Sequence, residues 1–293
     1  MRCGSVVALG LVVVLGTACG SDQLPGPSAP DPAAAVAATS TGSATPGGPS
    51  TAGGLSTRTA DRPGGTSGGA GGPRRFASPQ ELCDAVLTAV RAQGSVLITT
   101  TSQGTSLVSR RSIQLTGGGQ DSESRLTIPG QPDQSLLVVD DVPYLGTGDD
   151  KGPRWMRTRY EDLVAGKVWA SAVYAVDLPT ELASWRLATA VAGGDAGVSD
   201  GQGVRTYTLT LGPAAAAAQV RLDRVPSVDR TGVAERLAHM QYDLTVTLGA
   251  DDLPRTVTTV APVSGLTTTQ TYSQWGRVAV NTPTPSDVVT PTS

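Results

Sequence analysis

The sequence is poor in the residues that bind metals or carry out covalent chemistry. Its 293 residues include one His, three Cys and one Phe, and 16% of them are charged. One His cannot build a site of several histidines, and three Cys cannot supply the four thiolates of an all-cysteine zinc site. We therefore predict no metal site and no cofactor. The net charge of −3 offers no basic surface, so we also predict no nucleic-acid partner.

Gly and Pro, by contrast, are abundant near the start of the chain. The chain has 36 Gly and 21 Pro, and 21 of these 57 residues fall within residues 20–75. Of the 56 residues in that segment, 45 are Gly, Pro, Ala, Ser or Thr. Such a segment buries too little apolar surface to offset the entropy of ordering it. We predict that residues 19–75 form a disordered tether with a reach of about 40 Å.

Residues 1–18 have the pattern of a signal peptide. Arg2 gives a positive start, an apolar run extends from Val6 to Leu15, and small residues precede Cys19. The run is shorter than the roughly 20 residues that a membrane span requires. We predict that residues 1–18 are removed on export.

The Cys that follows these small residues resembles the lipidated Cys of the bacterial lipobox. The usual Leu three places before it is replaced by Gly16, with Leu15 one place further away. The resemblance implies that Cys19 receives a diacylglycerol and often an acylated amino terminus, which would anchor the chain to the outer face of the cytoplasmic membrane. The alternative is an ordinary secretory peptide. Cys83 is then the one unmodified thiol of the mature chain, and we expect it to be buried and inert.

We predict that a single folded domain spans residues 76–288, followed by a flexible tail at 289–293. A helix is expected from Pro79, because Ser78 can cap it, Glu81 completes a Ser-x-x-Glu capping box and Gly94 can end it. Further helices are expected at 178–188, 214–221 and 233–240. Alternating apolar and polar residues predict antiparallel strands with one buried face. The predicted strands are 95–101, 125–128, 136–140, 142–145, 206–211, 242–248, 255–260, 267–275 and 277–282.

This order of elements predicts an α+β fold in which one large antiparallel sheet curls as a half-barrel around a few helices. The domain also resembles the actinobacterial lipoproteins LppX, LprA, LprF and LprG, which have a LolA/LolB-like fold. Leu136–Leu145 followed by Trp155, the stretch Gly203–Leu211, and Thr271–Gly276 carry this resemblance. Arg makes up 20 of the 22 basic residues, a bias that suits an actinobacterial source.

The resemblance implies an apolar cavity between sheet and helices that binds or carries acyl chains of a lipid or glycolipid in envelope transport. The apolar stripes expected to line this cavity are Val96, Ile98, Leu126, Ile128, Leu137, Val139, Leu182 and Trp185. The same residues would also fill a closed core. A scaffold or sensor ectodomain with a membrane-protein partner is therefore the alternative, and the chain is predicted not to be an enzyme.

A serine hydrolase is the remote alternative. Gly197–Gly201 reads Gly-x-Ser-x-Gly around Ser199, and Asp223, Asp229 and His239 follow in the order of α/β-hydrolases. The nucleophile elbow needs a strand before the Ser and a helix after it, whereas here a Gly-rich loop is expected before it and a strand after it. Three Asp pairs, at 140–141, 149–150 and 251–252, are expected in turns rather than at a calcium site. Arg157 and Arg159 could meet a lipid headgroup, although a solvated strand face is expected there.

Overall fold

The computed structural model describes residues 74–146, 155–165, 169–261 and 265–289. The predicted signal peptide, the lipidation site Cys19 and almost all of the predicted tether lie outside the described residues, as does the Asp149–Asp150 pair.

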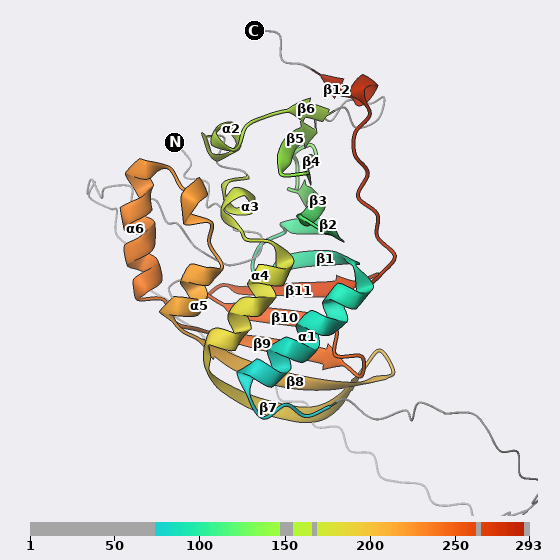
Figure 1. The fold of residues 1–293 in the computed structure, drawn as a ribbon, viewed down its shortest axis with the longest axis vertical. Helices are drawn as coiled ribbons and strands as arrows, with labels where there is room; N and C mark the ends of the chain where they lie inside the picture. The colour runs from blue at the N-terminus through green and yellow to red at the C-terminus, as the bar shows by residue number, and fades with distance from the viewer. Residues whose placement is uncertain (1–73, 147–154, 166–168, 262–264, 290–293) are drawn as a thin grey trace, which may run out of the picture. The chain divides into compact units, whose positions relative to one another are not determined.

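One curled sheet of twelve strands forms the framework of the described domain (Figure 1). Its strand order is β12-β6-β5-β4-β3-β2-β1-β11-β10-β9-β8-β7, and the two edge strands do not meet, so the sheet is not closed. Every neighbouring pair is antiparallel except β12 and β6. The strands are β1 (Ser95–Ser102), β2 (Val108–Thr116), β3 (Gly119–Thr127), β4 (Gln134–Val139), β5 (Val142–Gly146), β6 (Trp155–Arg157), β7 (Ala188–Ser199), β8 (Gln202–Leu211), β9 (Tyr242–Gly249), β10 (Pro254–Val260), β11 (Thr267–Ser273) and β12 (Val288–Val289).

Helices cover one face of this sheet, which we call the inner face. In Figure 1, α1 and α4 cross the strands around β9 to β11, while α2 and α3 lie beside β2 to β5. The predicted fold class, a curled antiparallel sheet around a few helices, is thus confirmed. The helices are α1 (Pro79–Gln93), α2 (Tyr160–Ala165), α3 (Ala170–Tyr174), α4 (Leu178–Ala183), α5 (Pro213–Ala218) and α6 (Ser227–Ala238), with short 3-10 turns η1 (Ser184–Leu187), η2 (Leu222–Arg224) and η3 (Pro285–Asp287).

The first helix begins and ends where its capping residues predict. The Ser78 hydroxyl accepts a hydrogen bond from the Glu81 amide at 3.2 Å, and Pro79 occupies the first turn. The Glu81 carboxylate accepts from the Ala77 amide, one residue before the usual capping-box donor. Gly94 ends the helix in the left-handed region at φ 72°.

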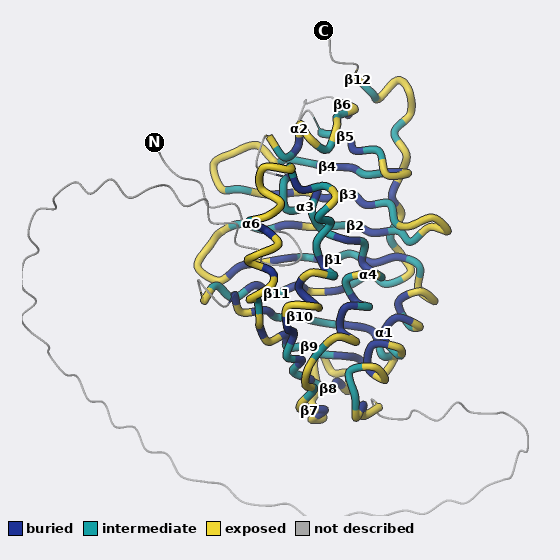
Figure 2. The backbone as a smooth tube through the Cα atoms, turned by 60° about the vertical axis from the view of Figure 1, so that its left-hand side comes forward, coloured by how far each residue is buried: buried dark blue, intermediate teal, exposed yellow. Residues whose placement is uncertain are grey.

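The main hydrophobic core lies between α1, α4, α5 and the inner face of β1, β2 and β8 to β11. Leu82, Leu182 and Trp185 are almost fully buried there, against Val246 and Leu209 of the sheet. Full burial of each such side chain contributes about 1.5–3 kcal/mol to stability. Figure 2 shows that the buried stretches follow the strands and α1, whereas α6 is largely exposed.

The chain after β11 runs along the outer face of the sheet. The Val278 amide donates to Ser95 Oγ at 3.2 Å, and the Val280 amide donates to Gln114 Oε1 at 3.0 Å. The strand predicted at 277–282 is therefore wrong: these residues are extended, but they bond side chains of the sheet instead of joining its ladder. The segment continues to Val289, which pairs with Met156, so the predicted domain boundary at 288 falls inside β12.

Four strands and two short helices are additions to the predicted elements, and β6 and β12 are the short strands among them. β2 had no counterpart in the prediction, and β7 occupies the stretch that was expected to be a Gly-rich loop. β7 lies at the sheet edge and contains a bulge at Gly193, whose φ is 94°. A β-carbon at Gly193 would lie 2.6 Å from the Thr206 carbonyl oxygen, so the close approach of β8 requires glycine there.

Candidate functional site

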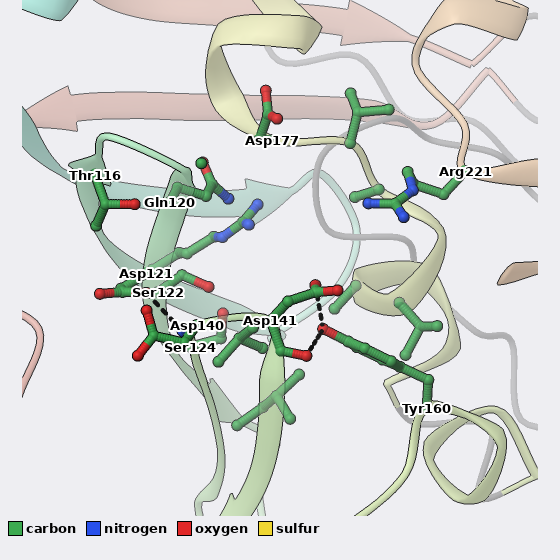
Figure 3. A pocket seen from close by; sticks show the side chains of 18 of the residues that line it. Thr116, Gln120, Asp121, Ser122, Ser124, Asp140, Asp141, Tyr160, Asp177 and Arg221 are labelled. Carbon is green, nitrogen blue, oxygen red and sulfur yellow. Dashed lines mark hydrogen bonds between the residues drawn. The ribbon is translucent and has the colours of Figure 1, made fainter. Parts of the chain in front are cut away.

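A pocket of about 700 Å³ lies on the inner face of β2, β3 and β4. Helix α3, the residues that lead into α4, and the basic residues at 221 and 224 form its other walls. In Figure 3, Ser122 and Ser124 come from the sheet side, and Tyr160 and Arg221 lie across from them. The volume falls within the range of about 300–1,000 Å³ that is usual for ligand sites.

Strand register fixes the chemistry of the pocket floor. Ile98, Arg111, Ser124, Leu136 and Leu145 pair in succession across β1 to β5, so they form one lateral row on the inner face. Directly opposed residues of neighbouring antiparallel strands have β-carbons about 4.5–5.5 Å apart. From β2 to β5, the row therefore begins with two polar side chains, Arg111 and Ser124, and ends with two leucines.

Arg111 is the charged residue of this floor. Among the residues that the structure describes, its guanidinium makes no hydrogen bond and no ion pair within 4.0 Å. Burial lowers the pKa of Arg111, and the charges of Glu181, Tyr272 and Asp177 act against that decrease. Arginine nevertheless stays protonated in proteins, so the site holds a positive charge that lacks a direct partner.

Glu181, on α4, is the acidic residue with the largest electrostatic effect on Arg111. Burial raises the pKa of Glu181, and Arg111 opposes that rise. The second acidic group, Asp177, caps α4 by accepting from the Thr180 amide at 2.7 Å. Neither carboxylate forms an ion pair with Arg111.

A buried polar network supports α4 at this position. The Tyr242 hydroxyl donates to Gln219 Oε1 at 2.8 Å, and the Gln219 amide donates to Ser184 Oγ at 2.6 Å. Ser184 in turn donates to the Glu181 carbonyl at 2.6 Å. Burial also raises the pKa of Tyr242 and keeps its hydroxyl protonated as a donor. The network holds the helix that carries Glu181 against the sheet.

Tyr160 and two charged residues form the mouth of the pocket. The Tyr160 hydroxyl donates to Asp141 Oδ1 at 3.0 Å (Figure 3). Arg224 pairs with the same carboxylate at 2.5 Å. The Arg224 guanidinium also lies over the Tyr160 ring, 3.9 Å from its centroid. Burial is the main cause that raises the pKa of Tyr160 to about 12. Arg221, the other cation of the mouth, pairs with Asp223 at 3.0 Å.

Two polar atoms that are completely shielded from solvent have no hydrogen-bond partner among the described residues: Ser109 Oγ and Trp169 Nε1. Ser109 lies two residues before Arg111 on the same face of β2, and it is opposite Leu126. Trp169 packs in a second hydrophobic cluster with Leu126 and Leu136. Buried polar atoms without partners are rare in native proteins, and both of these belong to the half of the domain that contains the pocket.

None of the eight predicted cavity residues lines this pocket. Val96, Ile98, Leu182 and Trp185 belong to the main core, where the side chains of α1 and α4 fill the space above the sheet. Leu126 and Ile128 belong to the second cluster, with Trp169 and Val173. Leu137 and Val139 lie on the outer face, under Val280 and beside Trp155, because strand residues alternate between faces. Their neighbours Leu136 and Val138 line the pocket instead.

The residues considered for catalysis do not form a site. Ser199 and the following Asp200 and Gly201 make the exposed turn of the β7–β8 hairpin, so the strand before Ser199 leads into another strand and not into a helix. His239 follows α6 as its C-cap. Asp140, Asp141 and Asp252 have positive φ angles in turns, as expected for Asp there. Arg159 pairs with Asp162 at 3.0 Å, and Arg157 is exposed.

Other expected features can be placed as well. Cys83 is buried with its thiol 3.3 Å from the Leu182 carbonyl oxygen, and burial raises its pKa, so it is placed as expected for an inert thiol. Within the described ranges, no three His, Cys, Asp or Glu residues gather as metal ligands. In the same ranges, no helix is long and apolar enough to cross a bilayer.

Comparison with known proteins finds similarity at the level of structure. Neither a scan against models of protein families nor a search of curated proteins finds a match. Among solved structures, the chain is similar to LprF from Mycobacterium bovis, with 13% identity, a TM-score of 0.48, and coverage of 73% of this chain and 99% of that chain. It is also similar to the Mycobacterium tuberculosis lipoprotein LppX, with 14% identity, a TM-score of 0.43, and coverage of 69% and 98%.

A third similar structure is the Pseudomonas aeruginosa MucA/MucB complex, with 13% identity, a TM-score of 0.34, and coverage of 67% of this chain and 56% of that chain. LprF and LppX are members of the family that the sequence resembles. Similarity at such identities concerns the fold alone, and TM-scores below 0.5 say nothing about a ligand. The fold class follows from the strand order itself.

Proposed function

We propose that the chain is an extracytoplasmic lipoprotein, anchored through a lipidated Cys19, whose inner-face pocket binds an amphiphilic lipid or glycolipid. The pocket carries this proposal, because it has both a polar and an apolar side within about 700 Å³. Arg111, Ser122 and Ser124 form the polar side, while Leu136 and Val138 begin the apolar side.

The apolar side continues through α3. Val173 and Val176 line the pocket, and Val173 packs with Leu136 and Trp169 in the second cluster. An acyl chain in contact with these side chains leaves water, at about 0.8 kcal/mol for each buried methylene. The polar side can meet a headgroup at the same time. A ligand with a polar and an apolar part therefore suits the pocket better than a wholly apolar one.

The predicted anchor and tether give this binding a place in the cell envelope. Two or more acyl chains on Cys19 hold the chain stably at a membrane. A tether with a reach of about 40 Å lets the domain move between that membrane and a nearby acceptor. We assign the domain a carrier or holding role and no catalytic step.

Recovery of the ligand tests this proposal. The full chain carrying Cys19→Ala, exported and purified without detergent, is expected to contain an amphiphile that native mass spectrometry detects at about one per chain. Ser122→Phe, which places a ring on the pocket floor, is expected to abolish that recovery. Ser112→Phe is the matched control, because Ser112 lies on neighbouring β2 and pairs with Glu123, on the opposite face. Equal recovery from both variants, or no amphiphile in either the parent chain or Ser112→Phe, overturns the proposal.

A further inference from the structure

The pocket floor contains hydrogen-bond donors that the protein itself does not use. Arg111 makes no hydrogen bond or ion pair among the described residues, and the hydroxyls of Ser122 and Ser124 have no partner there either. Ser124 is directly opposite Arg111 in the β2–β3 ladder, and Ser122 is two residues further along the same face. Three unused donors, one of them charged, thus lie together on one floor.

The acids that line the pocket do not neutralise this floor. Asp141 is paired with Arg224 and accepts from Tyr160, and Asp177 caps α4. Asp121 accepts from the Asp140 amide at 3.0 Å, and Asp140 itself is exposed at the mouth. Glu181 is not among the lining residues and makes no ion pair with Arg111, and burial raises the pKa of its carboxyl. The charge of Arg111 is therefore available to a ligand.

The apolar side chains lie on one side of Arg111. In the lateral row of the floor, Leu136 is two strands from Arg111 and Leu145 is three, or about 14 Å at the usual strand spacing. On the other side of Arg111, Ile98 belongs to the filled main core. An occupant that meets Arg111 with its polar end can extend its apolar part along the floor towards β4, under α3, and not towards β1.

From this arrangement we infer that the pocket selects an anionic amphiphile, whose carboxylate or phosphate lies against Arg111, Ser122 and Ser124 and whose chain lies on Leu136 and Val138. This inference rests on the proposed function and specifies the ligand class for the same pocket. A guanidinium donates two parallel hydrogen bonds to a carboxylate or phosphate, and serine hydroxyls can bond the remaining oxygens.

Four probes of equal chain length test the ligand class on the full chain carrying Cys19→Ala: dodecanoate, dodecyl phosphate, dodecanol and dodecyl maltoside. Titration calorimetry is expected to show the two anions binding at least about tenfold more tightly than the two neutral probes, since hydrogen bonds to charged groups are worth about 1.5–3 kcal/mol. The relative affinity of the two anions then distinguishes a fatty acid from a phospholipid as the source of the headgroup. Acetate and inorganic phosphate are expected to bind weakly, because they lack the apolar part.

Neighbouring arginines on β2 provide a matched control. Arg111→Gln is expected to weaken dodecanoate binding at least about tenfold and to leave dodecanol binding unchanged. Arg110→Gln removes the same charge from an exposed residue one position away, on the outer face, and is expected to change neither. Arg111→Lys keeps the charge but not the two parallel donors, and intermediate binding is expected. Thermal unfolding of each variant identifies any loss of the fold.

The outcomes separate the two proposals. If the neutral probes bind as tightly as the anions, or Arg111→Gln binds dodecanoate as the parent does while Ser122→Phe does not, the anion inference is wrong and the proposed function stands. If acetate or phosphate binds as tightly as its dodecyl counterpart, the floor binds a free anion and the amphiphile assignment is wrong. If no probe binds the folded parent chain, both proposals fail.

Discussion

Leu136 and Leu137 are adjacent in the sequence and lie on opposite faces of β4, Leu136 in the pocket and Leu137 under Val280. Leu137 is 1% exposed, so Leu137→Ala is expected to lower the free energy of unfolding by about 2–5 kcal/mol. It should leave dodecanoate affinity within about twofold, since it removes no pocket contact. Leu136→Ala is expected to lower both stability and affinity. Urea unfolding and calorimetry measure the two effects, and a large loss of affinity in Leu137→Ala would contradict the assignment of faces.

Gly193 should tolerate no side chain. Its φ of 94° is strained for an L residue, and a β-carbon would lie 2.6 Å from the Thr206 carbonyl oxygen. Gly193→Ala is expected to cost about 1–3 kcal/mol of unfolding free energy. Gly197, on the same strand, would place its β-carbon 3.6 Å from Val204 Cγ2, an ordinary contact. Gly197→Ala is the control, and equal stability of the two variants would show that the bulge is not needed.

Glu181 should make stability depend on pH. Burial raises its pKa in the folded chain, so the folded state binds the proton more tightly than the unfolded state. The stability that the protonated Glu181 carboxyl contributes to the folded state is therefore fully present below its ordinary pKa. That stability is lost as the pH rises through the raised pKa of the folded state. Glu181→Gln stays neutral and is expected to gain stability over the parent as the pH increases through that window. Urea unfolding from pH 4 to pH 8 measures the free energy of unfolding of both chains. If the parent becomes more stable relative to Glu181→Gln as the pH rises, the predicted direction is wrong.

Tyr207 fixes the start of the domain to β8. Its hydroxyl accepts from the Phe76 amide at 3.2 Å and donates to the Arg74 carbonyl at 2.9 Å. Tyr207→Phe keeps the ring against Phe76 and is expected to cost about 1 kcal/mol. Hydrogen exchange of the Phe76 amide should accelerate, whereas Tyr144→Phe, on the outer face, should leave that amide unchanged. Unchanged protection in Tyr207→Phe would mean that other contacts hold this end.

The fold was predictable where local signals agree with the tertiary environment. The cap at Ser78, the stop at Gly94 and the alternation in β8 and β9 each predict the element that forms. The helices α2 and α3 have six and five residues, which is too short for a periodic pattern. β7 lies at an edge with most of its residues exposed, so its composition resembles that of a loop.

The candidate site could not be predicted from the sequence, because the strand that carries Arg111 lacks a clear strand pattern. β2 has Ser109 and Arg111 on its inner face, where a core strand would have apolar residues, so its sequence lacks the alternation that indicates a strand. Because the inner face of β2 is polar, the strand could not be recognised from its sequence. The same polar face contributes Arg111 to the pocket floor. Leu136–Val139 is a continuous apolar run, and such a run does not show which residues face inward. The covering of the outer face by Val280 resolves that ambiguity in the structure.

The pairing of β1 with β11 has a consequence for the order of folding. The first strand of the domain forms its ladder with a strand that begins about 170 residues later, at Thr267. The centre of the sheet therefore cannot form until nearly the whole chain has left the ribosome or the export channel. A domain built in this way completes its fold only after its C-terminal part has been delivered, and pairing over so long a sequence separation slows folding.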